Sequence, residues 1–477
     1  MTVYEEFLRL LDFSEEELPA QLLRWKTACD FLGLTERDIS FAMHEWIPVY
    51  WDLRLHGVRK CIGAYIRELI EMTRLSEYKD RGDKILYYNM PIHPACIYAN
   101  KLRGGDRVHI SYPDYIVATV FNAFFHKGVQ PDEKNASLRS PICHQCGMNR
   151  IKANDYFRKI IAEPTVLWNW GLYCNEGHKT EELLQNLSDR QWNQVLTTIP
   201  KDALSDVPET QDGARVEYLT EQLKFGQSQI SEYTGVQVTD EDVVMAVEEY
   251  LAYLSKVERL MDRMSVADPQ PITGNDLAIF YAPSQIAFDT GFKYLNDAID
   301  CMILETEERI AGEEGPLPKH APRLACQFVP FSVPWINKAF VDSGVNLSIN
   351  TFFALASAQR RHFDRDNIYK SIALQWLSNP SAVNMQNEVE LVCEILEKYP
   401  QDGVLYGFFD FGCWIGSLQK TMIKMVEEKT GIPHYYFESE FWDDARYSIE
   451  DRITRIQNIS YKVKINHMIS GHKHAKK

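Results

Sequence analysis

The sequence lacks any long apolar run. None of its hydrophobic stretches reaches the roughly 18 to 20 residues that a helix needs to span a bilayer. The first seventeen residues are acidic and amphipathic, unlike the basic and apolar pattern of a secretory signal. We therefore expect a cytoplasmic protein with no membrane partner, in which cysteine thiols stay reduced rather than forming disulfides.

Positive charge is also scarce. The 477 residues contain 51 Lys and Arg against 67 Asp and Glu, which gives a formal net charge of -16 at pH 7. Nucleic-acid backbones are bound by clustered Lys and Arg. The one basic cluster is the tail at residues 472–477, which is typical of a solvated terminus. We expect no nucleic-acid partner.

Several common catalytic motifs are missing as well. The sequence has no phosphate-cradling P-loop, no dinucleotide fingerprint and no recognisable Ser/His/Asp arrangement. What it does have is ample material for burial, because 45% of the residues are hydrophobic and 12% are aromatic. A chain of this length exceeds what one hydrophobic core usually serves, so more than one domain is expected.

The order of the expected elements defines the fold class. Residues 1–80 repeat apolar side chains at helical spacing and form a helical N-terminal segment. A first α/β domain then covers 81–267, and a Pro- and Gly-bearing link at 268–274 opens a second α/β domain over 268–477. Strands that alternate with helices predict two doubly wound, parallel sheets. Strands are expected at 84–88, 108–112, 165–170, 324–329, 345–349, 404–409 and 434–437, and a helix at 181–196.

Cysteines follow the predicted strands at several places. Cys413 comes after the strand at 404–409 in a glycine-rich turn, and Cys174 comes four residues after Trp170. Cys143 and Cys146 lie in the segment SPICHQCGMN, which opens a helix and could face the same crevice. Ligands of open parallel sheets lie beyond the carboxyl ends of the strands. Thiolates presented from such loops suit an iron–sulfur cluster in a cleft between the domains.

Two other interpretations of these cysteines remain open. Cys143, Cys146, Cys174 and His178 have a spacing compatible with a structural zinc site, although that would leave Cys413 without a role. The thiols could also be small buried apolar side chains. The remaining cysteines are expected to be buried core residues, namely Cys29, Cys61, Cys96, Cys301, Cys326 and Cys393.

Two further polar residues follow predicted strands. His93 (in MPIHPAC) and Asp114 (in SYPDY) could face the same crevice as the cysteines. Each residue is a candidate acid or base, and each is equally compatible with a hydrogen-bonded structural role.

The C-terminal third of the sequence resembles the family of 2-hydroxyacyl-CoA dehydratases and benzoyl-CoA reductases. The similar segments are DGVLYGFFDFGCWIGS at 402–417 and EEKTGIPHYYFESEFWDDARYSIED at 427–451. DPQPITGNDLAIFY at 268–281 and LACQFVPFSVPW at 324–335 fit as well. The resemblance extends from about residue 80 to the end, and FESEFWDDARYS is nearest to the larger, cluster-bearing subunit of benzoyl-CoA reductase.

The resemblance implies an oxygen-sensitive [4Fe–4S] subunit of anaerobic metabolism. Its ligands would be Cys174, Cys413 and Cys143, with Cys146 as an alternative to Cys143. It would pair with a homologous second subunit, and a separate ATP-hydrolysing iron–sulfur activator would supply one electron. The acyl-CoA substrate would then react as a ketyl radical.

The reaction expected from the resemblance is an oxidoreductase one, the reduction of an aromatic or unsaturated acyl-CoA. The alternative is a lyase reaction, the dehydration of an (R)-2-hydroxyacyl-CoA. The positions where the dehydratases have a serine and a glutamate hold Pro91 and Asp114 here, which argues against dehydration. A non-catalytic scaffold subunit is a third possibility.

Overall fold

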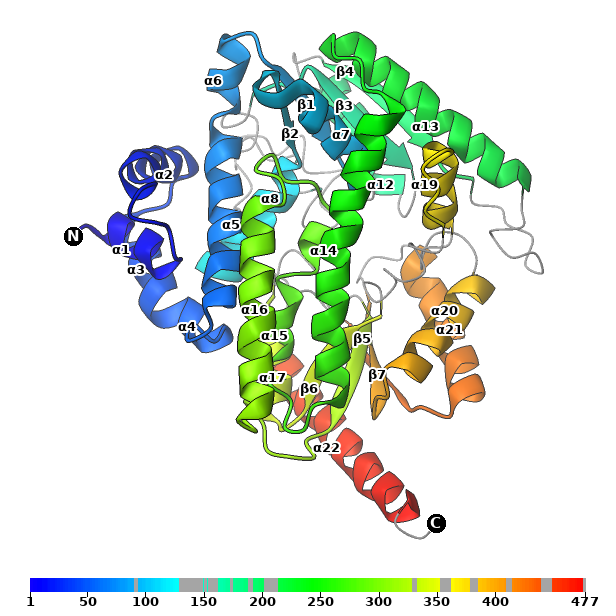
Figure 1. The fold of residues 1–477 in the computed structure, drawn as a ribbon. Helices are drawn as coiled ribbons and strands as arrows, with labels where there is room; N and C mark the ends of the chain where they lie inside the picture. Colours follow the sequence, from blue (N-terminus) through cyan, green and yellow to red (C-terminus); the bar gives the residue numbers. More distant parts are fainter. Residues whose placement is uncertain are drawn as a thin grey trace.

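The computed structural model describes most of the chain and shows two parallel sheets with helices packed around them (Figure 1). A group of helices at the N-terminus packs on one side, so the predicted fold class is confirmed. The domain boundaries at residues 80 and 267 stay predictions. The described residues are 1–89, 93–127, 149, 152, 162–171, 175–187, 192–200, 213–327, 333–351, 362–377, 385–408, 414–438 and 448–474.

The first sheet has the strand order β2-β1-β3-β4, and every neighbouring pair is parallel. Its chain adds β2 on one side of β1 and then crosses back to add β3 on the other side. The carboxyl ends of β1 and β3 therefore form the switch point where doubly wound sheets bind ligands. The strands are β1 (Lys84–Tyr88), β2 (Val108–Ser111), β3 (Val166–Gly171) and β4 (Asn193–Thr198).

The second sheet repeats this topology. Its order is β6-β5-β7-β8, again entirely parallel, so β7 holds the place in this sheet that β3 holds in the first. Its central strands read as continuous apolar runs because helices cover both faces. The strands are β5 (Arg323–Gln327), β6 (Asn346–Asn350), β7 (Gly403–Phe408) and β8 (His434–Glu438).

The N-terminal segment is helical, as predicted, and forms part of the main core. Phe7, Trp25 and Trp51 are fully or almost fully buried in the same apolar cluster as strand β1. Its elements are α1 (Val3–Leu10), α2 (Leu18–Leu32), α3 (Glu36–Phe41), a π-helical turn (Ala42–Trp46), α4 (Ile47–Tyr50), α5 (His56–Thr73) and α6 (Leu75–Asp80).

Two long helices, α14 (Asp240–Val266) and α16 (Lys293–Ala311), pack against each other, and α14 extends from α7 (Pro94–Gly104) to β6 of the second sheet (Figure 1). Thr239 and Asp242 form a capping box at the start of α14. The other helices are α8 (Pro113–Thr119), α12 (Asn175–Leu187), α13 (Gly213–Thr234), α15 (Gly274–Ala278), α17 (Trp335–Asp342), α19 (Ile368–Leu377), α20 (Met385–Lys398), α21 (Trp414–Thr430) and α22 (Ile449–His474). None of the described helices is long and apolar enough to cross a bilayer.

The helix predicted over 181–196 is wrong in its second half. Helix α12 ends at Leu187, and β4 occupies Asn193–Thr198 beside β3. Val195 and Thr197 are buried whereas Leu196 between them is 48% exposed, so the side chains alternate with the period of a strand.

Candidate functional site

The carboxyl ends of the two sheets flank the same stretch of chain. Tyr88, the last residue of β1, donates a hydrogen bond from its hydroxyl to the carbonyl of Ala287 over 2.5 Å and accepts one from the Ala287 amide over 2.9 Å. Tyr281, six residues earlier, lies against the backbone of Asn350, the last residue of β6. Both carboxyl edges therefore border one region between the sheets, where the sequence predicts a site.

The four cysteines proposed as ligands lie outside the described residues, but their neighbours are described. β3 ends at Gly171 and α12 begins at Asn175, so Cys174 directly precedes a helix. β7 ends at Phe408 and α21 begins at Trp414, so Cys413 does the same. The two cysteines thus follow the third strand of two equivalent sheets. The start of a helix favours negative charge and lowers the pKa of a nearby thiol, which suits a thiolate ligand.

The other cysteines are poorer candidates for ligands. Cys29, Cys61, Cys96 and Cys326 are free and buried, as predicted. Burial raises the pKa of the Cys326 thiol to about 12, and thiols that remain protonated do not bind metals.

Cys301 and Cys393 are only half-buried, on α16 and α20. Within the described part of the chain, no three His, Cys, Asp or Glu side chains come close enough to hold a metal ion. The zinc interpretation involves Cys143, Cys146, Cys174 and the His178 side chain, which also lie outside that part.

An asparagine pair lies at the switch point of the first sheet. The amide of Asn89, just after β1, donates a hydrogen bond to the side-chain oxygen of Asn169 in β3, and both residues are buried. Neither asparagine was predicted as a site residue. The available signal was Asn169, a polar residue within the otherwise apolar strand VLWNWG.

Asp114 belongs to a buried group of charges. It is the second residue of α8, just beyond β2, and its Oδ2 lies 3.0 Å from the Lys152 ammonium. Lys152 also donates a hydrogen bond to Glu181 of α12, and all three side chains are buried. We call Asp114, Lys152 and Glu181 the charged triad. Lys152 and Glu181 were not predicted, because only the fold brings them to Asp114.

The triad shifts the proton affinities of its members. Burial raises the pKa of Asp114 to about 6, the Lys152 cation opposes this increase, and the Glu181 carboxylate adds to it. Burial disfavours the charged Lys152 amine, but the two carboxylates outweigh that cost and raise its pKa. Asp114 can therefore exchange a proton near neutral pH.

His93 is held by hydrogen bonds at both ring nitrogens. Its Nδ1 accepts a hydrogen bond from the Ala95 amide over 3.3 Å at the start of α7. Its Nε2, which must then carry the proton, donates to Oε1 of Gln375 in α19 over 2.9 Å. Burial lowers the pKa of His93 to about 4, so the ring is neutral at physiological pH. His93 thereby links the end of β1 to a helix of the second half of the chain.

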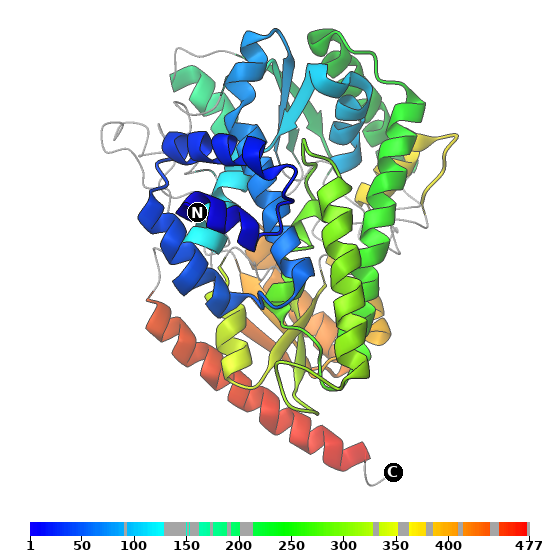
Figure 2. The same ribbon diagram turned by 60° about the vertical axis from the view of Figure 1, so that its left-hand side comes forward.

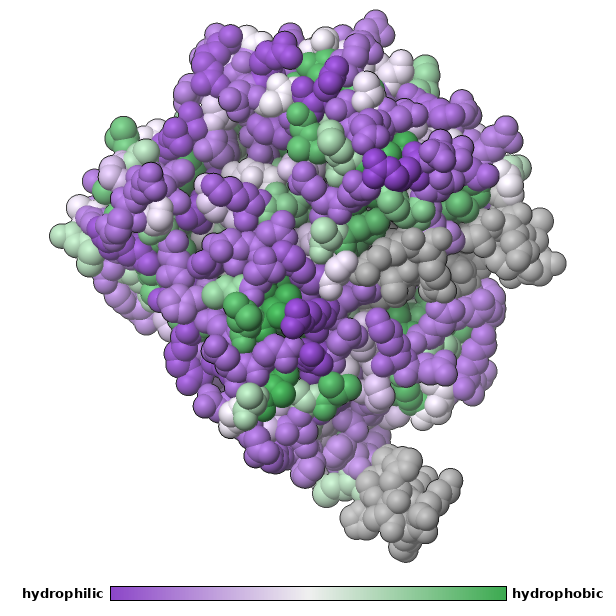
Figure 3. Space-filling view, in the orientation of Figure 1, coloured by the Kyte–Doolittle hydropathy of each residue, from purple (hydrophilic) through white to green (hydrophobic). Residues whose placement is uncertain are grey.

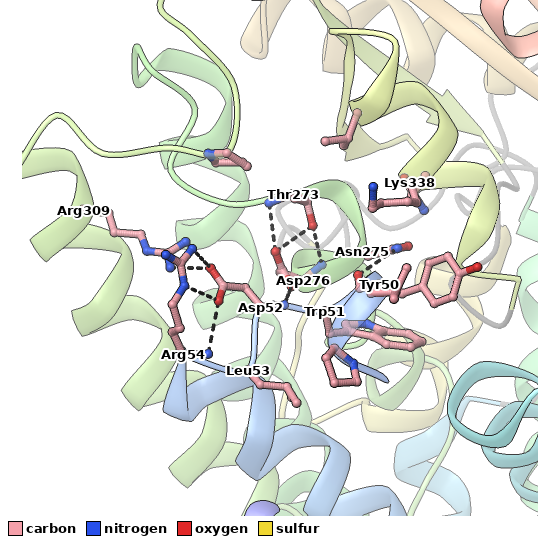
Figure 4. A pocket seen from close by; sticks show the side chains of 15 residues that line it. Tyr50, Trp51, Asp52, Leu53, Arg54, Thr273, Asn275, Asp276, Arg309 and Lys338 are labelled. Atoms are coloured by element: carbon pink, nitrogen blue, oxygen red, sulfur yellow. Dashed lines mark hydrogen bonds and ion pairs between the residues drawn. The ribbon is translucent and has the colours of Figure 1, made fainter. Parts of the chain in front are cut away.

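A pocket of about 600 Å³ opens elsewhere, between the N-terminal segment and helices α15, α16 and α17 (Figure 4). Its charged groups are largely used to join these elements. Asp52 accepts hydrogen bonds from Arg54 over 2.7 and 2.8 Å and from Arg309 of α16 over 2.6 Å. The Asp52 amide donates to Asp276 of α15 over 2.9 Å. We interpret these contacts as the attachment of the N-terminal segment.

Comparison with known proteins agrees with the resemblance seen in the sequence. Residues 174–459 match the family described as 2-hydroxyglutaryl-CoA dehydratase, D-component. The match includes Cys174, Cys413 and the whole second sheet, and leaves out the N-terminal helices and the end of α22. Among curated proteins, no relative matches the chain. The chain belongs to the 2-hydroxyglutaryl-CoA dehydratase D-component family, a family of subunits that work with a partner component.

Proposed function

We propose that this chain is the [4Fe–4S] subunit of an ATP-dependent radical enzyme that acts on an acyl-CoA thioester. The observation that supports the proposal is that β3 and β7 hold equivalent places in the two sheets and that each is followed by a helix. Cys174 and Cys413 come directly before these helices in the sequence. Cys143 or Cys146 would supply the third thiolate. A homologous second subunit and a separate ATP-hydrolysing activator would complete the system.

The cluster, when bound by these thiolates, would supply one-electron chemistry to the substrate. The chain's own residues would handle protons and orientation. We assign Asp114 as the acid or base, because burial keeps its pKa near 6 and Lys152 stabilises its ionised form. For His93 we propose a positioning role rather than proton transfer, since both of its ring nitrogens are engaged.

Two reactions are compatible with this assignment. The FESEFWDDARYS segment favours reduction of an aromatic or unsaturated acyl-CoA, which is the reaction we propose. The family match favours the second candidate, dehydration of a 2-hydroxyacyl-CoA. Assays with benzoyl-CoA and with a 2-hydroxyacyl-CoA, in the presence of partner, activator, ATP and a reductant, distinguish the two.

Substitution of a proposed cysteine ligand tests whether the chain holds the cluster. In anaerobically purified protein, Cys413→Ser is expected to lose most of its iron and acid-labile sulfide, together with the electron paramagnetic resonance signal of the reduced cluster. Cys393→Ser, which alters a half-buried thiol on α20, is expected to retain both. Unchanged iron in Cys413→Ser would refute the ligand assignment. A wild-type preparation containing only zinc, or no metal, would support the zinc or scaffold alternatives.

A further inference from the structure

The pocket beside the N-terminal segment contains groups that the attachment of that segment does not use. Its volume of about 600 Å³ is in the range of small-molecule sites. Residues 48–54 form one wall, and residues on and around α15, α16 and α17 form the other. Figure 2 shows the N-terminal helices, in blue, above α17, in yellow-green. The first wall precedes residue 174, where the family match begins, so half of the pocket lies outside that match.

Three polar side chains in these walls have hydrogen-bonding groups without a partner. Trp51, Asn275 and Asn337 line the pocket, and each is at most 4% exposed. Within the described residues, the Trp51 indole N–H and Asn275 Oδ1 have no hydrogen-bond partner. The orientation of the Asn275 amide is fixed, because its nitrogen donates to the carbonyls of Tyr50 over 3.1 Å and Pro334 over 2.9 Å. Buried polar groups are almost always hydrogen-bonded, so this concentration favours a polar occupant of the pocket.

Asn337 and Lys338 present adjacent polar groups from α17. The Asn337 side-chain amide forms no hydrogen bond with any described residue, although its nitrogen is able to donate two. The Lys338 ammonium pairs with Asp342, one turn later on the same helix. This pair lies at the surface, with the Asp342 side chain 59% exposed, and surface pairs contribute little to stability. Lys338 is therefore able to exchange Asp342 for a charged ligand.

The other charged groups of the pocket are more firmly engaged. Asp52 is held by both Arg54 and Arg309, and Asp276 accepts hydrogen bonds at the start of α15. With Lys338, three cations and two carboxylates line the pocket, which gives it a net charge of +1 in a chain whose total is -16. In Figure 4 the two arginines lie on one side of Asp52 and Lys338 lies on the other. Lys338 is thus the cation best placed to bind an anion, since the arginines already share a carboxylate.

Apolar side chains supply much of the remaining lining, among them Leu53, Pro316 and Val341. Val341 comes three residues after Lys338 and four after Asn337, so these three side chains share one face of α17. The pocket therefore combines an amide and a cation with an apolar surface. Figure 3 shows hydrophobic residues only as separate patches within hydrophilic surface on its face of the molecule, so the concave pocket is a better candidate for binding a compound with an apolar part.

We propose that this pocket binds a small organic carboxylate with an apolar body, such as benzoate or hexanoate. The carboxylate would accept hydrogen bonds from the Lys338 ammonium and the Asn337 amide, and the apolar body would lie against Leu53 and Val341. Because the walls come from residues 48–54 and from α17, the bound carboxylate would join the N-terminal segment to the second half of the chain. Binding would therefore stabilise the attached position of that segment.

Other classes of ligand fit less well. A nucleoside di- or triphosphate carries several negative charges, whereas the net charge of the pocket is only +1. A metal cation is disfavoured by the same positive charge. A purely apolar compound would bury the Asn337 amide without giving it a hydrogen bond.

This inference does not rest on the proposed function. Binding requires no cluster, acyl-CoA or activator, and none of the described lining residues belongs to the charged triad. Purified protein without iron should bind the carboxylate as tightly as iron-loaded protein. The outcome of the binding test is therefore separate from the outcome of the enzyme assays.

Isothermal titration calorimetry of the full-length chain with benzoate tests the proposal. We expect one site with a dissociation constant of about 1 mM or less, a value within reach of a ligand of this size. Benzamide has the same shape without the charge and should bind about tenfold more weakly. Inorganic phosphate has the charge without the apolar body and should also bind more weakly. Absence of benzoate binding would overturn the proposal, as would benzamide or phosphate binding as tightly as benzoate.

Variants of α17 test the assigned residues. Lys338→Met removes the cation, keeps an unbranched side chain, and should weaken benzoate binding by about tenfold. Asn337→Asp has nearly the same size but places a negative charge beside the carboxylate, so binding should be lost. Lys424→Met removes a lysine from the exposed surface of α21 and is the matched control, which should bind like the wild type. Equal affinities in the two lysine variants would refute the site, and this comparison decides the question even if Asn337→Asp does not fold.

Hydrogen exchange locates the bound carboxylate. Benzoate should slow exchange in residues 48–54 and in α17 of the wild type, and this protection should be absent in Lys338→Met at the same benzoate concentration. Protection confined to another part of the chain would show that benzoate binds elsewhere and would overturn the assignment.

Discussion

At the scale of single residues, the charged triad gives the most direct test of the proposed proton transfer. Asp114 sits between a cation that stabilises its carboxylate and a carboxylate that destabilises it. If Asp114 acts as the general base, kcat/KM of the assembled enzyme should fall as the pH drops through about 6. Lys152→Met removes the cation, so the acid limb of the pH profile should move to higher pH.

Glu181→Gln should move the same limb in the opposite direction, because it removes the negative charge that raises the pKa of Asp114. Lys152→Arg keeps the positive charge and should stay near the wild type. Profiles that do not move in either variant would mean that Asp114 is not the titrating group. Iron content measured in parallel separates this outcome from loss of the cluster.

The lowered pKa of His93 leads to a prediction about the stability of the protein rather than its activity. Its pKa is about 4 in the folded protein and 6.5 as an ordinary histidine, so the unfolded chain binds more protons between these values. Stability should therefore decrease as the pH falls from 6.5 to 4, by about 3 kcal/mol from this residue. His93→Asn retains a side-chain acceptor for the start of α7 but cannot titrate.

Urea unfolding midpoints followed across this pH range should consequently fall less steeply in His93→Asn than in the wild type. The variant loses the hydrogen bond to Gln375, so its stability above pH 6.5 should be lower. Equal slopes for the two proteins would show that His93 is not buried in its neutral form.

At the scale of elements, every strand of the two sheets except β4 was predictable from the sequence. β1 and β7 read as short apolar runs ending in polar or glycine-rich turns, because both of their faces are covered. β4 lies at the edge of its sheet, and its exposed Leu196 interrupts the apolar pattern. The sequence there was mistaken for a continuation of α12, because the spacing of apolar residues along the chain does not show that β4 pairs with β3.

The candidate site was predictable to a similar extent. Cys174 and Cys413 are candidate ligands because a strand, a turn and a helix follow one another along the chain, and their role stays a prediction. Lys152 and Glu181 were not recognisable, since their role depends on distances to Asp114 that only the fold sets. Local motifs therefore suggest candidate residues, and tertiary contacts decide which polar residues lie beside one another.

Helix α13 supports β3 through a close contact at Gly226. A Cβ atom there would lie 2.8 Å from Cζ2 of the buried Trp168 and 3.0 Å from the Thr197 hydroxyl. Gly226→Ala should therefore push α13 away from the strand that precedes Cys174, at a cost of about 1 to 3 kcal/mol. Gly213→Ala, at the start of the same helix, meets no atom within 4 Å and should cost nothing.

The measurement for this pair is the thermal unfolding midpoint, with iron content as a second readout. A Gly226→Ala protein as stable as Gly213→Ala would show that the helix has room to move. Iron content reduced only in Gly226→Ala would show that the packing behind β3 also supports the ligand loop.

At the scale of the whole molecule, the N-terminal helices are joined to the second half of the chain through Asp52. Burial would raise the pKa of Asp52, but hydrogen bonds from Arg54 and Arg309 outweigh it and lower the pKa. Its carboxylate therefore stabilises the folded protein at neutral pH, and this contribution is lost as the pH falls below the ordinary value of 3.8. Because Arg309 lies on α16, the link joins segments more than 250 residues apart in the sequence.

Asp52→Asn should weaken this link by about 1.5 to 3 kcal/mol, the usual contribution of hydrogen bonds to a charged group. Hydrogen exchange should then increase in α4 and at the start of α5, while the strands of the second sheet stay protected. Arg54→Gln should have a smaller effect, because the Arg54 side chain is 84% exposed and surface ion pairs contribute little. Equal exchange in both variants would mean that buried apolar contacts such as those of Trp51, and not the charges, hold the N-terminal segment in place.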